Sequence, residues 1–460
     1  MEWWIVLPAI ALPWVTGAIL VYAIDTRLGL RELPYAAAFG YVLGIVLAAT
    51  LFALQLRVLG VASPRWSAAI LVGIAVAGGL LLQRRAAEAT PEAIKDLPGP
   101  DSKKSMLWFG LLAWVVLKIA LAVFEVVRQP LLSWDAWTTW LMRSRVWVES
   151  GGYVPFTDPA TALGRTMGYS IEASAYPELV SWISAWSAAW GGSWSESNAV
   201  LPWIALAVVL PLGVYAGLRR VAVPPTLAIT AVWALLSLPL LATHLAMAGY
   251  ADLWLATSLA FGLMAGFQWL RAGSSPDLIV TILCVLIAAR VKPEGLIWAA
   301  LFPMVLLAVR SGVTTLLALL LAGLLGMLIL FQLDGVRVVV PVLGTLTFGW
   351  PASISEVGWH LWIYGNWQLL FWLLGAVLLA VLLTARHYPI DKARLGLLAW
   401  VIASVGGFLF LFLWTDSAEW ARLGTANNRV LLQLVPGLVF WLAVELTENP
   451  LLSRITRPTS

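Results

Sequence analysis

Thirteen long apolar runs divide this chain, and each has about the length that a helix needs to cross a membrane. The hydrocarbon core of a bilayer is ~30 Å thick, which an α-helix crosses in about 20 residues. Backbone amides cannot stay unpaired in hydrocarbon, so such runs must be helical. The sequence therefore predicts an all-α polytopic membrane protein with about 13 transmembrane helices. The predicted spans are roughly residues 3–24, 35–56, 66–83, 106–127, 199–218, 224–247, 251–270, 277–290, 295–309, 313–332, 361–384, 395–414 and 430–445.

The composition excludes the soluble classes of protein. Hydrophobic residues make up 61% of the chain and charged residues only 11%, which does not suit a water-facing surface. The same apolar content excludes a disordered chain. The only cysteine, Cys284, lies in an apolar run, so there is no intrachain disulfide. The net charge of +4 comes from scattered basic residues, and we therefore expect no nucleic-acid partner.

Basic residues are shared unevenly between the two sides of the predicted bundle. Lys and Arg near the ends of spans resist translocation, so the side that carries more of them is cytoplasmic. Outside the long segment 128–197, sixteen fall on one side and seven on the other when thirteen spans are threaded. We therefore predict an N-terminus outside and a C-terminus in the cytoplasm. The three largest polar connections, 128–197, 333–360 and 415–429, then face outwards.

A polar linker at residues 84–105 separates the predicted spans into two groups. The predicted parts are three leading helices in 1–83, the cytoplasmic linker 84–105, a transmembrane module in 106–445 and a cytoplasmic tail, 446–460. Within the outer segment 128–197, two stretches carry apolar and aromatic residues at helical spacing, which predicts helices lying in the plane of the interface. They are residues 141–148 and 176–190, and the second is alternatively a re-entrant element.

The densest group of candidate functional residues follows the fourth predicted span, on the outer side. Asp135 lies there between Trp134 and Trp137, and Trp140 continues the spacing of three. An aromatic face of this kind suits a sugar ring or a prenyl chain, and Arg143 suits a phosphate. For the tryptophans alone, an interfacial aromatic belt is the stronger interpretation. For Asp135 between two of them, we favour a functional role.

Two outer hairpins add further charged candidates. A turn of a few residues places Asp252, close to Tyr250, at membrane depth, where a carboxylate is costly unless it faces a polar cavity or a cation. In the second hairpin Arg290, Lys292 and Glu294 alternate, so that the cations could hold a phosphate while Glu294 orients one of them. A helix cap for Asp252 and a salt-bridged turn for the second hairpin are alternatives of comparable weight.

The remaining polar residues carry weaker signals. Arg429 begins the last predicted span, where it either reaches to the interface or clamps a phosphate. Lys118 lies in the middle of the fourth span and is interpreted as structural. The histidines His244, His360 and His387 are too far apart for a His-x-x-His site, so we predict no metal ligands, and a divalent cation held by carboxylates stays open.

Taken in order, these motifs resemble the GT-C superfamily of glycosyltransferases that use polyprenyl-phosphate sugars. The chain looks most like the bacterial membrane proteins related to the protein O-mannosyltransferases and to the lipid A aminoarabinose transferase. The resemblance covers roughly residues 106–445 and depends on the order of the motifs and their shared outward side. The matching stretches are Trp134-Asp135-Ala136-Trp137, Tyr176-Pro177-Glu178-Leu179, Gly249-Tyr250-Ala251-Asp252, Lys292-Pro293-Glu294-Gly295, and Arg429 with Pro436.

The resemblance implies roles for individual residues. Asp135 corresponds to the loop carboxylate that acts as catalytic base, and Asp252 to a second acidic position that supports or orients the acceptor. Lys292 and Arg429 correspond to basic positions that hold the donor phosphate. Further phosphate-binding residues would be Arg143 and Arg290, and supporting residues would be Glu294, Trp134, Trp137, Tyr250 and Glu178.

The resemblance also implies partners, a location and a reaction. The protein would lie in the bacterial inner membrane among lipids and bind a polyprenyl-phosphate sugar at its periplasmic face, with a glycan, lipid or protein as acceptor and no certain cofactor. One carboxylate suffices for an inverting displacement from phosphate. Two features depart from the family, since Asp135 is followed by Ala136 rather than a second acid, and the helices in 1–83 are additional. The alternatives are a non-catalytic accessory subunit that binds lipid or a membrane-protein partner, and a flippase or transporter of lipid-linked glycans.

Overall fold

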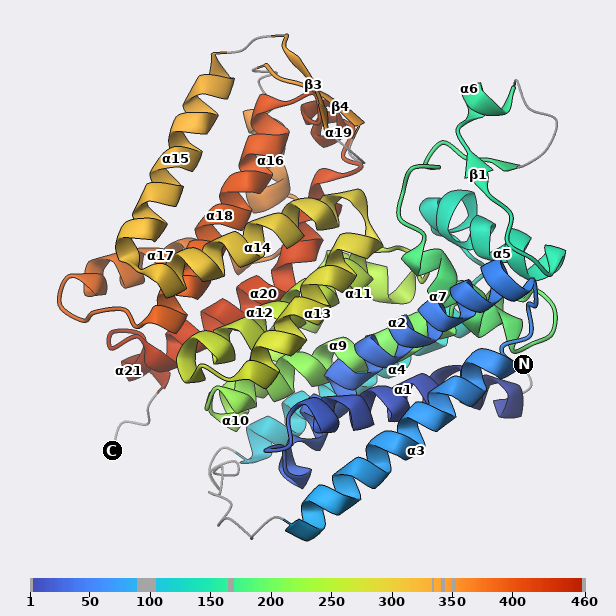
Figure 1. The fold of residues 1–460 in the computed structure, drawn as a ribbon. Coiled ribbons are helices and arrows are strands. Elements are labelled where there is room, and N and C mark those ends of the chain that lie inside the picture. The colour runs from blue at the N-terminus through green and yellow to red at the C-terminus, as the bar shows by residue number, and fades with distance from the viewer. Residues whose placement is uncertain are drawn as a thin grey trace. The chain divides into compact units, whose positions relative to one another are not determined.

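The computed structural model describes residues 3–88, 105–163, 169–332, 335–340, 344–349 and 353–456, most of them in α-helices (Figure 1). The chain forms two compact units. Unit 1 consists of Met1–Trp233 and Ala242–Trp254, and unit 2 of Ala234–Leu241 and Leu255–Ser460. The helices α10 (Pro225–Ser237), α11 (Pro239–Ala246) and α12 (Asp252–Ala272) contribute residues to both.

Unit 1 contains the leading helices and the long segment 128–197. Its helices are α1 (Trp3–Ile24), η1 (Leu30–Glu32), α2 (Leu33–Leu59), α3 (Arg65–Glu88), α4 (Ser105–Arg128), the π-helix η3 (Ala136–Trp140), α5 (Leu141–Ser150), α6 (Pro159–Ala162), α7 (Leu179–Ala189), α8 (Glu196–Ala199) and α9 (Leu201–Arg220). The short strands β1 (Phe156–Thr157) and β2 (Tyr169–Ser170) pair in parallel.

Glycines allow α1 and α2 to cross closely. Gly40 and Gly44 are four residues apart in α2, and a Cβ on Gly17 of α1 would lie 1.7 Å from the carbonyl oxygen of Gly40. A Cβ on Gly44 would lie 1.8 Å from the carbonyl oxygen of Pro13. Small residues at this spacing let helix backbones approach within a membrane.

The three leading helices pack against the rest of unit 1. α2 lies against both α7 and α9, and Trp186 of α7 donates its Nε1 proton to the carbonyl of Ala9 in α1 at 3.0 Å. The predicted linker at 84–105 therefore does not separate two compact units. Its residues 89–104 lie outside the described residues.

The helix α7 differs from its prediction. All eleven of its residues are buried, among them Trp182 and Trp186. A helix lying in the interface plane needs one face in contact with lipid and one with water. The interfacial interpretation of residues 176–190 is therefore wrong, because α7 is part of the core of unit 1.

Unit 2 is built from the later helices. They are α13 (Ser275–Val291), α14 (Pro293–Ser311), α15 (Val313–Phe331), α16 (Ile354–Trp362), α17 (Leu370–Ala385), α18 (Lys392–Trp414), α19 (Ala418–Arg422), α20 (Asn427–Glu448) and α21 (Ser453–Thr456), with most of α12. The strands β3 (Arg337–Val340) and β4 (Gly344–Thr347) form an antiparallel pair with Arg337 opposite Thr347. These two short strand pairs are small additions to a mostly helical chain, which agrees with the predicted all-α class.

In unit 2, α14 and α20 run in the same direction, and α18 runs in the opposite direction. Near the N-termini of α14 and α20, Trp298 donates its Nε1 proton to Oε1 of Gln433 at 2.9 Å. Toward their C-termini, Arg394 at the start of α18 pairs with Glu445 of α20. Gly396, two residues further along α18, lies beside Leu306 of α14. The N-termini of α14 and α20 consequently lie at the same end of this unit.

Ten helices of the described chain are long and apolar enough to cross a membrane, and the pair α10 and α11, bent by 72°, makes an eleventh if it is one span. Each coincides with a predicted span. The predicted spans 277–290 and 361–384 correspond to α13 and α17, which have only 17 and 16 residues. The chain is thus a multi-pass helical membrane protein, and the total of thirteen spans stays a prediction. The ten are Leu7–Ile24, Leu30–Leu59, Arg65–Arg84, Ser105–Arg128, Glu196–Arg220, Asp252–Ala272, Pro293–Ser311, Val313–Leu330, Lys392–Trp414 and Asn427–Glu448.

Polar contacts within each unit join residues that the predicted threading places on the same side. This agreement supports the order in which the spans cross, while the side that faces the cytoplasm stays a prediction. The outer pairs are Arg57 with Glu178 and Thr347 with Asp416, and the inner pairs are Asp25 with Arg220 and Arg271 with Glu448.

Candidate functional site

Two of the motifs that carry acidic residues pack together in unit 1. The Ser133 hydroxyl donates toward the carbonyls of Ala248, at 2.7 Å, and Met247, at 3.2 Å. Gly249 has φ of 105°, and a Cβ on it would lie 2.4 Å from the Cβ of Ala136. The segment that carries Asp135 therefore lies directly against the turn that precedes α12.

The two carboxylates in these motifs have different surroundings. Asp135 is half-buried and immediately precedes the π-helix η3, a rare element that is common at functional sites. Asp252 has no exposed surface and is the first residue of α12, where the helix dipole favours a negative charge. Only Asp135 is open to a bound molecule, so Asp252 can act on one only through a neighbour.

The turn before α12 is held by aromatic residues. Trp203 of α9 donates its Nε1 proton to the carbonyl of Tyr250 at 2.9 Å. The ring of Tyr250, which is half-buried, lies 5.0 Å from the ring of His244. Tyr250 thus supports the turn that packs against the Asp135 segment.

The three tryptophans around Asp135 do not form one aromatic face. Trp134 and Trp137 are 64% and 47% exposed, with ring centroids 4.7 Å apart. Trp140 is completely buried, and its ring lies 5.7 Å from that of Tyr176. The prediction failed for Trp140 because the turn is a π-helix, which is wider than the α-helix that a spacing of three assumes. Two exposed rings beside Asp135 remain available.

Arg143 is engaged by the protein backbone. Its side chain is buried, and its guanidinium donates to the carbonyls of Tyr176, Ala173 and Ser174 at 2.8 to 2.9 Å. Burial lowers the pKa of Arg143 from that of an exposed arginine, although the charge of Glu178 opposes this shift. The assignment of Arg143 to a donor phosphate is therefore corrected, because both of its terminal nitrogens, Nη1 and Nη2, already bond the loop before α7.

Glu178 lies in a cluster of charged and aromatic side chains. Its carboxylate pairs with Arg57 of α2 and accepts hydrogen bonds from the Tyr153 hydroxyl at 3.2 Å and Trp182 Nε1 at 3.1 Å. The Arg57 guanidinium lies over the Tyr153 ring, 4.4 Å from its centroid. Trp147 stacks on Trp182 with centroids 3.8 Å apart. The cluster ties the segment 128–197 to the end of α2, so Glu178 supports the architecture of unit 1.

In unit 2 the hairpin between α13 and α14 holds the predicted cations. Lys292 is buried, and its Nζ lies 3.3 Å from Oε1 of Glu294. The second carboxylate oxygen of Glu294, Oε2, is buried without a hydrogen-bond partner in the described part of the chain. Arg290 is exposed. A Cβ on Gly295 would lie 2.0 Å from the carbonyl oxygen of Ala288, so the motif requires glycine to close this hairpin.

Arg429 lies on α20 at the position that corresponds to Glu294 on α14. Trp298 and Gln433 are hydrogen-bonded, and residues four positions apart share a helix face. Glu294 lies one turn before Trp298 on α14, and Arg429 lies one turn before Gln433 on α20. Because the two helices run in the same direction, both residues lie at the N-terminal end of the faces that α14 and α20 turn toward each other. Lys292 and Arg429 thus belong to one end of unit 2.

A polar cluster that the sequence did not reveal lies at the start of α20. Asn428 accepts a hydrogen bond from Trp367 Nε1 at 3.2 Å, and its Nδ2 lies 2.7 Å from Nδ1 of His360. The amide of Asn427 is completely buried, and neither its oxygen nor its nitrogen has a partner among the described residues. Two consecutive asparagines before Arg429 were the available sequence signal, but nothing connected them with a histidine 68 residues away.

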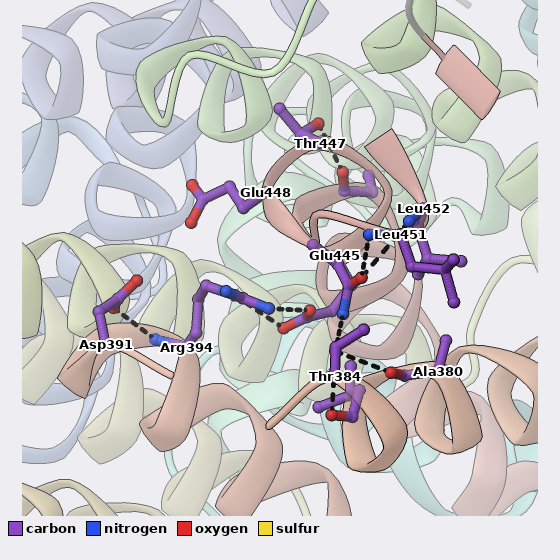
Figure 2. A network of polar contacts seen from close by, with 12 residues as sticks. Ala380, Thr384, Asp391, Arg394, Glu445, Thr447, Glu448, Leu451 and Leu452 are labelled. Atoms are coloured by element: carbon purple, nitrogen blue, oxygen red, sulfur yellow. Dashed lines mark hydrogen bonds and ion pairs between the residues drawn. The ribbon is translucent and has the colours of Figure 1, made fainter. Parts of the chain in front are cut away.

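The opposite end of unit 2 is closed by a buried ion pair (Figure 2). Arg394 Nη2 lies 2.6 Å from Glu445 Oε2, and both side chains are buried. Asp391 caps α18, and Asn449 donates to the Thr384 hydroxyl at 2.9 Å. These partners satisfy one another, so this end of the unit serves to hold α17, α18 and α20 together.

Among the described residues, the remaining candidates form no metal site, and Lys118 has no carboxylate partner. In the part of the chain that the structure describes, no three His, Cys, Asp or Glu side chains are close enough to hold a metal ion. Lys118 lies over the Trp114 ring, 5.3 Å from its centroid, and pairs with no carboxylate of the described residues.

No protein-family model, curated protein or solved structure matches the sequence. Asp135 and Asp252 belong to unit 1, and Lys292 and Arg429 to unit 2. The convergence of the acids with these cations at one rim is therefore still a prediction.

Proposed function

We propose that the protein is a glycosyltransferase that moves a sugar from a polyprenyl-phosphate donor to an acceptor hydroxyl at the outer face of a bacterial inner membrane. The proposal places thirteen spans in the membrane, with the N-terminus outside and the C-terminus in the cytoplasm. The observation that carries it is the packing of the Asp135 segment against the turn before Asp252, made by Ser133 with Ala248 and by Gly249 with Ala136. It brings together the two acidic motifs on which the GT-C resemblance depends.

Asp135 is the proposed catalytic base. An acceptor hydroxyl is a poor nucleophile near neutral pH, so a carboxylate within hydrogen-bond reach must take its proton as the new bond forms. The half-exposed position of Asp135 beside the exposed rings of Trp134 and Trp137 suits this role. Asp252, which is completely buried, is instead a positioning residue for the turn that packs on the Asp135 segment.

Lys292 and Arg429 are the proposed ligands of the donor phosphate. In the transfer, the acceptor oxygen forms a bond to the anomeric carbon while the bond from that carbon to the phosphate oxygen breaks. The proton goes to Asp135, and the leaving phosphate takes the electron pair. Cations in a site shielded from water stabilise the developing charge better than they would in bulk solvent. Glu294 orients Lys292, from which it lies 3.3 Å away.

A matched pair of variants tests the base. Asp135→Asn should abolish transfer to an acceptor in membranes supplied with polyprenyl-phosphate sugars, while the thermal unfolding temperature stays near that of the wild type. The control is Glu149→Gln, which makes the same change at an exposed carboxylate of the same outer segment and should keep full activity. An unchanged rate in Asp135→Asn overturns the assignment.

A non-catalytic accessory subunit is the second candidate, and two observations favour it. Asp252 is buried, and Arg143 is hydrogen-bonded to backbone carbonyls. Fewer charged side chains are therefore open to a substrate than the resemblance implies. The same assay separates the two functions. An accessory subunit predicts that the wild type binds the lipid but transfers no sugar to any acceptor.

A further inference from the structure

A cleft at the outer end of α4 is unused by the proposed chemistry. It has a volume of about 330 Å³ and lies wholly in unit 1. Its walls are residues 126–132 at and after the end of α4, Glu196 and Ser197 of α8, Val200 just before α9, and residues 246–248 at the end of α11. The cleft therefore opens where a predicted span leaves the membrane.

The lining of the cleft is about equally polar and apolar, and it includes charged side chains. Val126, Val200 and Ala248 are buried parts of its wall. Arg128 is exposed, and its guanidinium lies over the Phe124 ring, 5.0 Å from the centroid. Among the residues that the structure describes, Arg128 forms no salt bridge with a carboxylate. A guanidinium held against a ring at the membrane boundary suits a phosphate.

An apolar strip leads along α4 to Arg128. Leu117, Leu121 and Phe124 are each about half exposed, at 55%, 50% and 51%. Spacings of four and three residues place them on the same helix face, and Arg128 follows four residues later. Only Val115, Ala122 and Val126 of the whole helix are buried. A hydrocarbon chain can lie along this strip with its polar end at Arg128.

The opposite wall of the cleft carries a carboxylate, Glu196, which suits hydrogen-bond donors rather than anions. Glu196 is exposed, and its Oε2 accepts a weak bond from the backbone N–H of Leu131 at 3.4 Å. A carboxylate on this wall repels a second negative charge but accepts hydrogen bonds from hydroxyl groups. The preferred headgroup is therefore one phosphate that carries hydroxyls.

We propose that this cleft binds the headgroup of an anionic membrane phospholipid, with its phosphate on Arg128, its hydroxyls toward Glu196 and one acyl chain along Leu117, Leu121 and Phe124. The site does not depend on the proposed transferase activity. Since Met247 and Ala248 line the cleft and also accept from Ser133, a bound lipid would stiffen the segment that carries Asp135.

Lipid binding by the purified full chain in neutral detergent tests this site. Native mass spectrometry would compare phosphatidylglycerol with phosphatidylcholine for the wild type, Arg128→Gln and the control Arg145→Gln, an exposed arginine of α5. We expect the wild type to prefer phosphatidylglycerol, Arg128→Gln to bind it about tenfold more weakly because a charge-assisted contact is lost, and Arg145→Gln to match the wild type. Equal binding of the two lipids, or an unchanged Arg128→Gln, overturns the proposal.

Cysteine protection locates the lipid and separates it from a free anion. The one natural cysteine, Cys284, is buried, so a cysteine placed at Leu132 on the cleft wall reports that position alone. Phosphatidylglycerol should slow its reaction with a maleimide several-fold, and it should not protect a cysteine placed at Met106, the exposed opposite end of α4. Inorganic phosphate should give no protection. Equal protection by inorganic phosphate would show an anion site without a lipid and overturn the proposal.

Discussion

Gly249 lies directly against Ala136, because a Cβ on Gly249 would come within 2.4 Å of the Ala136 Cβ. The φ of Gly249 is also positive, at 105°. This contact, with the hydrogen bonds of Ser133, holds the two acidic motifs of unit 1 together. We expect the contact to be the most sensitive point of the candidate site to added volume.

Gly249→Ala should therefore lower both stability and transfer. The control is Gly151→Ala, which also has a positive φ, of 68°, but open space where its Cβ would lie. Backbone strain alone should cost about 1–2 kcal/mol in the control, and the clash in Gly249→Ala about 1–3 kcal/mol more. Thermal unfolding in detergent measures both. Equal losses in the two variants would show that the contact with Ala136 is unimportant.

Arg143→Ala should destabilise the protein. Its guanidinium bonds three backbone carbonyls in a buried place, and leaving such acceptors unpaired costs about 1–3 kcal/mol each. Arg290→Ala is the control, because Arg290 is exposed, and it should unfold within ~0.5 kcal/mol of the wild type. Urea unfolding of the two variants checks this. A normally stable Arg143→Ala with weak donor binding would restore the phosphate assignment.

The buried pair in Figure 2 should respond unequally to single and double changes. Arg394→Ala leaves the buried Glu445 without its cation and should cost about 3–5 kcal/mol. Arg394→Met combined with Glu445→Leu should cost much less, because apolar side chains can replace a buried pair. Arg271→Ala, whose partner Glu448 is partly exposed, should lose about 1 kcal/mol or less. Thermal unfolding of the set decides whether the pair holds α18 to α20.

Stability should depend on His360 in mildly acidic solution. Burial lowers the pKa of His360 below the 6.5 of an exposed histidine, and a hydrogen bond to the backbone of Ala421 offsets this only in part. The unfolded chain then binds the proton at a higher pH than the folded protein. The contribution of His360 to the free energy of unfolding is complete above about pH 6.5. It falls as the pH drops from there toward the pKa of His360 in the folded protein.

The His360→Gln variant isolates this effect. Unfolding measured between about pH 5 and pH 8 should give a flatter profile for the variant than for the wild type. The amide of the introduced glutamine can still hydrogen-bond to Asn428, so the variant should fold. A profile that rises toward acid pH in the wild type would contradict the assigned direction.

Helical periodicity and charge were sufficient for the spans but not for the fine structure around Asp135. Spans of about 20 apolar residues have one stable backbone form in a bilayer, and ten of the predicted ones are such helices. The spacing of Trp134, Trp137 and Trp140 was misleading, because the turn is a π-helix and Trp140 turns into the core. Which turn type forms depends on packing against Tyr176, 36 residues away.

The pattern of apolar and charged residues was enough to predict the class of the protein, the order of its spans and the short list of charged residues near their ends. These follow from local properties, since hydropathy and the cost of burying a charge act residue by residue. The contacts of each side chain became known from the folded structure alone. Arg143 turned out to hold backbone carbonyls, and Asn428 turned out to face His360. Contacts between residues so far apart in the chain depend on how helices pack, which no local pattern specifies.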